Sequence, residues 1–148
     1  MSTIKVDTYL TRGGASEIAI DKLKGVTAAG SMLVVGEGGT NTTNLQQGLT
    51  KQWVNLDGTG TIATRDSFNT GSITDNGTGD YSAAFTSAMG NTNYGNSGEG
   101  GTGGGGTSHM MLCGHSKATG STRVTNLSDG GGAADRNIHC FITYGDLA

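Results

Sequence analysis

The sequence predicts an all-β protein: an antiparallel, jelly-roll-like β-sandwich that follows an extended N-terminal arm. Apolar and polar residues alternate in short runs such as Trp53-Val54-Asn55-Leu56, as strands with one buried face require. Turn dipeptides, Asp57-Gly58 and Asn76-Gly77, separate the runs, because Gly and Asn accept the positive φ of tight turns. The central and C-terminal parts lack helical periodicity, which excludes an alternating β/α architecture.

The composition predicts a thin apolar core. Of the 148 residues 33% are hydrophobic, 5% aromatic and 14% charged, with 28 glycines and no proline. The low charge distinguishes the chain from a typical disordered segment. A small core offsets chain entropy poorly. We therefore expect an oligomer in which subunit contacts supply further burial.

Residues 1–45 are predicted to form the arm, and residues 46–148 the knob. In the arm, Ile4, Val6 and Leu10 lie on one side of an alternating run that is typical of a strand. A second strand is expected over residues 16–24, with a short helix as its alternative, and an apolar patch follows at residues 32–35. The arm's strands would be completed by another subunit or by a larger assembly, unless they simply join the main sandwich.

The knob is predicted to contain eight strands. Tyr81, Ala83 and Phe85 share one face of the fourth. Four aromatic residues are expected to anchor the core or a subunit interface: Trp53, Phe68, Phe85 and Phe141. For Trp53 we favour core packing over ligand stacking. The predicted strands are residues 51–56, 60–65, 67–74, 80–86, 92–97, 107–115, 120–127 and 134–146.

The stretch from Lys51 to Tyr94 carries a series of motifs in a fixed order: QWVNLDGTGT, RDSFN, SITDNGTGDY and FTSAM. This order resembles a module of tail-fibre and other virion-surface proteins of tailed bacteriophages, marine ones especially. The closing segment 138–146 resembles the end of that module, and the opening STIKVDT resembles the N-terminus of short virion fibres. The glycine-rich middle does not match, so the resemblance says little about what is bound.

The resemblance implies a non-enzymatic structural protein of a virion, assembled in the host bacterial cytoplasm. It would form a short homotrimeric fibre anchored to other virion proteins through Ile4, Val6 and Leu10. The knob would adsorb to a glycan or protein of the host surface. The alternative is a capsid decoration or cement protein that coats or stabilises the head, which the short chain favours.

Residues 99–107, EGGTGGGGT, contain few side chains that can pack. One interpretation is an exposed recognition loop that presents Glu99, Thr102 and Thr107. The other is a plain flexible connector. A phosphate-binding loop is disfavoured, because the glycines are not followed by Gly-Lys-Ser/Thr.

The charge pattern argues against two classes of partner. The net charge is −3, and the nine basic residues are scattered instead of gathering on a basic face, so no nucleic-acid partner is expected. No apolar run of about 18 residues is present, so no membrane insertion is expected. The N-terminus also lacks the basic and apolar regions of a secretion signal.

Motifs for chemistry are sparse. His109 and His115 are too far apart along one predicted strand to share a metal, and no cofactor or metal site is expected. The aspartates fall mostly in turn signals, where they make local backbone bonds, and no nucleophile elbow occurs. The chain is therefore predicted not to be an enzyme. Cys113 and Cys140 each lie in a predicted strand, where they form either a disulfide or two small buried thiols.

Overall fold

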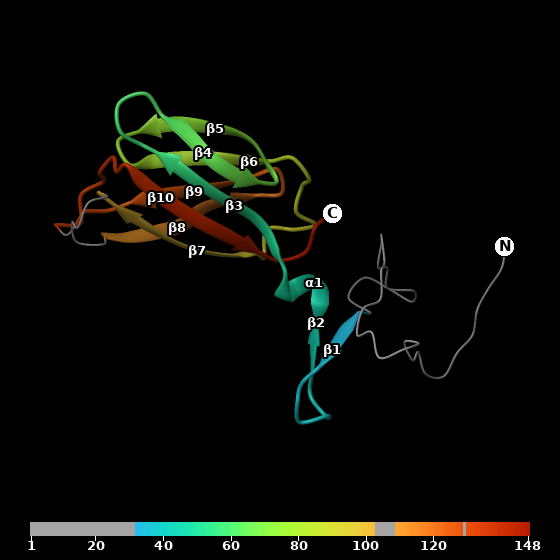
Figure 1. Cartoon of the computed structure of the whole chain (residues 1–148). Coiled ribbons are helices and arrows are strands. Elements are labelled where there is room, and N and C mark those ends of the chain that lie inside the picture. Colours follow the sequence, from blue (N-terminus) through green and yellow to red (C-terminus); the bar gives the residue numbers. More distant parts are fainter. Residues whose placement is uncertain (1–31, 103–108, 129) are drawn as a thin grey trace, which may run out of the picture.

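The computed structural model describes residues 32–102, 109–128 and 130–148. Within them lie ten strands and one short helix, and every strand pair is antiparallel (Figure 1). The all-β prediction is therefore confirmed. The elements are β1 Leu33–Val35, β2 Thr42–Asn44, α1 Leu45–Gly48, β3 Thr50–Asp57, β4 Ala63–Phe68, β5 Thr70–Gly77, β6 Asp80–Phe85, β7 Gly95–Gly101, β8 His109–Ala118, β9 Ser121–Asn126 and β10 Ile138–Tyr144.

The knob strands form one continuous hydrogen-bonded order, β4-β3-β10-β7-β8-β9-β6-β5. This order folds into two layers, with β4, β3, β10 and β7 on one side and β5, β6, β9 and most of β8 on the other (Figure 1). The chain passes between the layers at β4–β5, β6–β7 and β9–β10, and also along β8, which pairs first with β7 and then with β9. Residues far apart in the sequence are thereby brought to one interior.

The apolar core lies between the two layers and is small. Every second residue of β3, β6, β9 and β10 is buried, as their alternating pattern predicts. Tyr81, Ala83 and Phe85 share the buried face of β6, as expected. The main cluster is Val54, Leu56, Tyr81, Ala83, Val124 and Phe141.

Polar side chains fill the interior near the β3 start. Gln52 Nε2 donates to Thr70 Oγ1 at 3.1 Å, and Thr143 Oγ1 donates to Asn96 Oδ1 at 2.9 Å. Asn96 Nδ2 in turn donates to Thr122 Oγ1 at 2.7 Å. Five strands from both layers are thus joined through hydrogen bonds that compensate for burying these groups.

The two predicted turn dipeptides lie at chain reversals, but the turns differ from the simple expectation. Five residues, 58–62, separate β3 from β4, so Asp57-Gly58 opens a longer loop. Between β5 and β6 the turn residues are Thr78 and Gly79, which lie two residues after the predicted pair. Gly79 has φ +65°, and a Cβ there would come within 2.6 Å of Ala134 N, so tertiary contact also requires glycine.

The part of the predicted arm that the structure describes forms a separate two-stranded hairpin, β1–β2, that projects away from the knob (Figure 1). Asn44 caps α1, its Oδ1 accepting from Gln47 N at 3.2 Å. Helix α1 then joins the knob, where Gln47 Nε2 donates to Asp146 Oδ2 at 3.3 Å. The strands predicted before residue 32, with the anchoring residues Ile4, Val6 and Leu10, lie outside the described residues.

Candidate interaction surfaces

Phe68, Trp53 and Ile142 form a row across the outer face of β4, β3 and β10. The strand register pairs Trp53 with Phe68 on one side and with Ile142 on the other. Because the neighbours of Trp53 in β3 are buried, its own side chain points outward. Phe68 is 52% exposed, and Trp53 and Ile142 are half-buried. We call these three residues the outer row.

Trp53 therefore does not join the interior core, although the sequence analysis favoured core packing for this residue. Of the four predicted anchors, Phe141 and Phe85 are buried, whereas Trp53 and Phe68 lie on the outer face. Their role at a subunit interface stays a prediction. Ile142 was missed by the sequence reasoning, although its alternation with the buried Phe141 and Thr143 is a signal that could have placed it outward.

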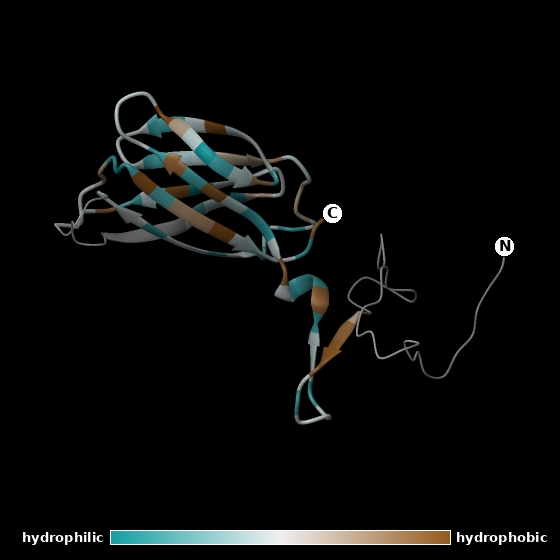
Figure 2. Ribbon diagram, viewed as in Figure 1, coloured by the Kyte–Doolittle hydropathy of each residue, from teal (hydrophilic) through white to brown (hydrophobic). Residues whose placement is uncertain are grey.

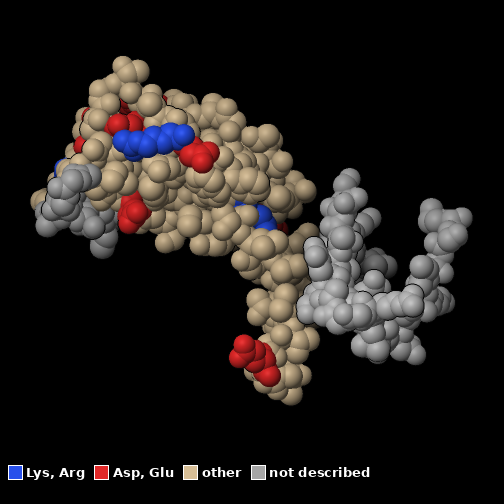
Figure 3. All heavy atoms as spheres, in the orientation of Figure 1, with Lys and Arg blue, Asp and Glu red and all other residues tan. Residues whose placement is uncertain are grey.

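The next row along the same outer face is polar. Asn55 pairs with Asp66 and with Cys140, and Cys140 pairs with Glu99. Arg65 reaches back over this region and donates to Asp57 Oδ2 at 2.7 Å. The outer face is consequently apolar near α1 and polar toward the opposite end. Figure 3 shows few charged groups on the face it presents, among them a basic side chain that lies between acidic groups.

The β1–β2 hairpin exposes its apolar residues. Leu33, Val34 and Val35 are 55%, 50% and 59% exposed, and β1 stands out as a brown strand in Figure 2. Successive side chains of a strand point to opposite faces, so these three consecutive apolar residues lie on both faces of the hairpin. Packing one face of the hairpin against the rest of the chain would therefore leave the other face uncovered. The hairpin is thus a second apolar surface, separate from the outer row.

The predicted recognition residues are not gathered in one loop. Glu99 lies within β7, exposed and paired with Cys140 and Met110, because glycines 100 and 101 continue the strand. Thr102 follows directly after β7 and is exposed, whereas Thr107 lies outside the described residues. For Glu99, the loop interpretation is therefore wrong.

Gly100, the next residue of β7, has a packing role, since a Cβ there would come within 2.2 Å of Asn126 Nδ2.

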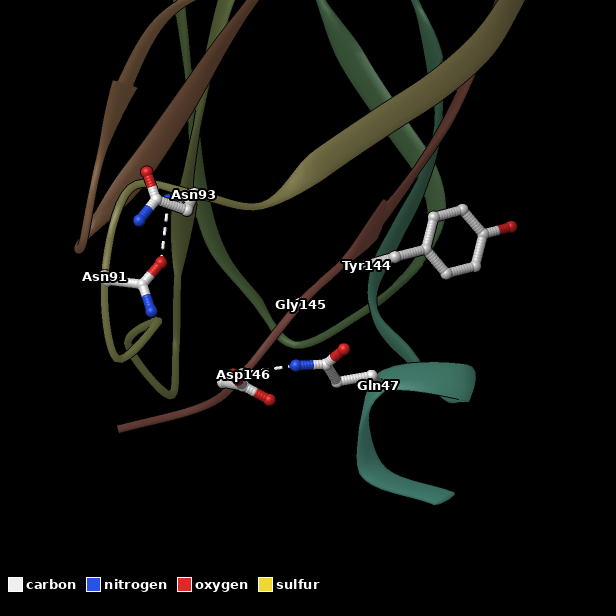
Figure 4. Close-up of a pocket in the computed structure, with 6 residues that line it drawn as sticks. All are labelled: Gln47, Asn91, Asn93, Tyr144, Gly145 and Asp146. Atoms are coloured by element: carbon white, nitrogen blue, oxygen red, sulfur yellow. Dashed lines mark hydrogen bonds between the residues drawn. The ribbon is translucent and has the colours of Figure 1, made fainter. Parts of the chain in front are cut away.

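A polar pocket of about 300 Å³ lies where α1 meets the end of β10. Figure 4 shows Gln47 beside Asp146, with Asn91 and Asn93 on the loop that leads to β7. Asn93 N donates to Asn91 Oδ1 at 2.7 Å, which holds that loop in its turn. None of these residues was a predicted site residue. The lining consists of Gln47, Asn91, Asn93, Tyr144, Gly145 and Asp146.

A histidine is buried at the opposite end of the core. The rings of His139 and Tyr81 lie edge to face with centroids 4.7 Å apart, and His139 Nε2 is 3.3 Å from Asn126 Nδ2. Burial lowers the pKa of His139 to about 4, although the charges of Asp135 and Asp57 act in the other direction. The Tyr81 hydroxyl donates to Asp135 Oδ1 at 2.8 Å. Burial, followed by this bond and the carboxylate's charge, raises the Tyr81 pKa well above its usual value.

Cys140 carries a free thiol whose pKa is raised chiefly by burial. Strand β7 separates its strand, β10, from β8, which contains Cys113. Across residues 32–102, 109–128 and 130–148, no group of three or more His, Cys, Asp or Glu side chains is arranged to hold a metal ion. Within these same ranges, no helix has the length and apolar character needed to cross a membrane.

Comparisons of the chain with protein-family models, curated proteins and solved structures find no match.

Proposed function

We propose that this protein is a non-enzymatic structural component of a bacteriophage virion. It acts as a short homotrimeric fibre whose N-terminal region attaches to other virion proteins. Its jelly-roll-like knob adsorbs to a glycan or protein of the host surface. The motif order between Lys51 and Tyr94 is the reason for choosing a virion protein among all-β proteins.

The observation that carries the proposal is the division between a self-contained knob and an apolar hairpin that the knob leaves exposed. Leu33, Val34 and Val35 are each at least half exposed. The outer row on the knob supplies a second apolar surface. A protein that works as an isolated monomer gains nothing from exposing both, whereas subunit contact and attachment would cover them.

Two measurements test the proposal. Light scattering of the purified full-length chain should give three times the mass of one subunit. Cryo-electron microscopy of intact particles should place the hairpin inward and the knob outward on the tail. A monomer in solution, together with particles that lack the chain, would reject the proposal.

The second candidate function is capsid decoration. The outer row favours it, because an exposed apolar face on the knob itself could lie flat against a capsid surface. Density at capsomer junctions or three-fold positions of the head would then be expected. Receptor binding would in that case need separate evidence.

A further inference from the structure

Tyr144 extends the outer row by one more aromatic ring. Phe141 and Thr143 of β10 are buried, so Ile142 and Tyr144 share the outer face of that strand. The Tyr144 ring is 38% exposed, and Figure 4 shows it turned away from the amide side chains of the polar pocket. We call the outer row together with Tyr144 the outer patch.

The outer patch has the composition that is typical of the centre of a protein interface. Three of its four residues are aromatic and none is charged, which matches the residue types that are enriched and depleted at such centres. The pairing of β4, β3 and β10 holds the outer row in register on a rigid sheet. The charged residues Asp66 and Glu99 lie in the next row, so whatever covers the patch itself must be apolar and uncharged.

One face of the β1–β2 hairpin has this character. Leu33 and Val35 lie opposite Asn44 and Thr42, so these four uncharged residues share one face, whereas Val34 lies on the other. Leu33 and Val35 are more than half exposed. An isolated two-stranded hairpin is only marginally stable in water. A further apolar surface against this face would therefore stabilise the hairpin.

Helix α1 keeps the hairpin of each chain away from its own outer patch. Lys51 Nζ donates to Gln46 O, and also to Leu49 O at 3.2 Å. Gln47 Nε2 donates to Asp146 Oδ2 at 3.3 Å. These bonds hold α1 against the knob, and the hairpin projects away from it (Figure 1). The two apolar surfaces of one chain consequently do not cover each other.

Neither surface is large enough to hold two copies together alone. An aromatic side chain covers about 150–250 Å², so Phe68 and Tyr144, 52% and 38% exposed, leave on the order of 200 Å² open between them. Each partner of a stable interface contributes roughly 800 Å². An assembly in which every copy uses both surfaces buries more than one built from hairpins alone or from patches alone.

We propose that the hairpin face that carries Leu33 and Val35 docks on the outer patch of a neighbouring copy of this chain. Every copy brings one such face and one patch, both uncharged, so each finds its partner in the next copy. The contact is heterologous, and around a three-fold axis it closes into a ring. It gives the subunit contact of the proposed homotrimer, and its trimeric form rests on that proposed function.

Single charges placed in the full-length protein test each side of the contact. Val35→Glu and Phe68→Lys should each weaken self-association at least tenfold in sedimentation equilibrium, because each buries a charge against an apolar partner. Two matched controls should associate as the wild type does. Val34→Glu places the same charge on the other face of the hairpin, and Thr74→Lys places one on exposed β5 in the opposite layer. Thermal unfolding checks that each knob is folded.

Combining the two charges in one chain tests whether hairpin and patch meet each other. In the double variant Val35→Glu/Phe68→Lys, the carboxylate of one copy faces the ammonium group of the next. This variant should associate at least fivefold more tightly than either single variant at low salt, and the recovery should fade at high salt. Charges that never meet would give a double variant no better than the weaker single one.

Four results would overturn the proposal. A wild-type chain that stays monomeric would assign both surfaces to other partners. Sensitivity to Val35→Glu alone would mean that hairpins pack on hairpins, and sensitivity to Phe68→Lys alone that patches pack on patches. A double variant without recovery would show that the two surfaces do not touch.

The outcome is separable from that of the proposed function. Charge-dependent assembly of a chain that is missing from particles would retain this contact and reject the virion role. Particles that carry the Phe68→Lys variant at the wild-type level and in the wild-type arrangement would retain the virion role and reject this contact.

Discussion

At the scale of the residue, His139 is a fully buried histidine whose pKa of about 4 lies below its ordinary value of 6.5. Between pH 6.5 and 4 the unfolded chain takes up a proton that the folded chain does not. The stability that His139 contributes is therefore complete above pH 6.5 and is lost as the pH falls through this window.

We expect acidification from pH 7.5 to 5.0 to lower the free energy of unfolding by about 2 kcal/mol through His139. Urea unfolding at the two pH values measures this. His139→Gln should lose most of the dependence in this range. The carboxyl of Asp80, whose pKa is lowered mainly by its hydrogen bond from Arg123, titrates at lower pH and does not mask the effect. Equal pH dependence in wild type and variant would contradict the assignment.

Asn69 connects β4 to β5 and is the one non-glycine residue with positive φ in the described part of the chain, at 54°. Its side chain holds two neighbouring segments: Nδ2 donates to Lys51 O at 2.8 Å, and Ser87 N donates to Oδ1 at 2.6 Å. Asparagine suits this position because it tolerates the left-handed region and bonds to backbone.

We expect Asn69→Ala to lower the free energy of unfolding by about 2–4 kcal/mol, since it loses these bonds and places a Cβ in the left-handed region. Asn69→Gly loses the bonds but keeps the backbone conformation, so it should be about 1 kcal/mol less destabilising. Chemical unfolding of both variants gives the comparison. If alanine were tolerated as well as glycine, backbone strain would not be a factor here.

At the scale of the element, β3, β10 and β4 separate two kinds of aromatic residue by strand alternation alone. Phe141 is 1% exposed and packs between the layers, whereas Phe68 lies on the outer face. The two phenylalanines therefore form a matched pair for separating folding from association.

Phe141→Ala should lower the free energy of unfolding by about 3–5 kcal/mol, as large-to-small changes in a core do. Phe68→Ala should change monomer stability by less than about 1 kcal/mol but reduce the oligomer fraction measured by light scattering. Trp53→Ala should resemble Phe68→Ala more than Phe141→Ala. A Phe68 variant with unchanged oligomeric state would remove the outer row from the interface.

At the scale of the whole molecule, the knob holds its own core and polar network, while β1–β2 contributes no residue to either core cluster. The hairpin meets the knob through α1, chiefly by Gln47 and Lys51. Folding of the knob should consequently not depend on the segment before α1.

We expect removal of residues 1–44 to leave a folded knob whose Tm changes by less than about 5 °C, which corresponds to about 1 kcal/mol in a domain of this size. Under the proposed function, the truncated chain should be absent from particles. Circular dichroism and particle composition measure the two outcomes. An unfolded truncated chain would show that the arm and knob are one folding unit.

Much of the fold could be predicted because strand alternation and turn chemistry are local. All eight predicted knob strands overlap observed ones, and the buried sets in β3 and β6 follow the sequence pattern. The candidate pocket could not be predicted in this way. Gln47, Asn93 and Asp146 come from three segments whose meeting depends on how the layers and α1 pack.

The sequence by itself determined the fold class, the strand positions and which residues of each strand share a face, since these depend on neighbours along the chain. Tertiary structure decided which face is interior, why Trp53 points outward and why Glu99 belongs to a strand. It also decided the low pKa of His139. The physical reason is that burial, register and hydrogen bonding between layers are relations between distant residues, which alternation within one strand does not contain.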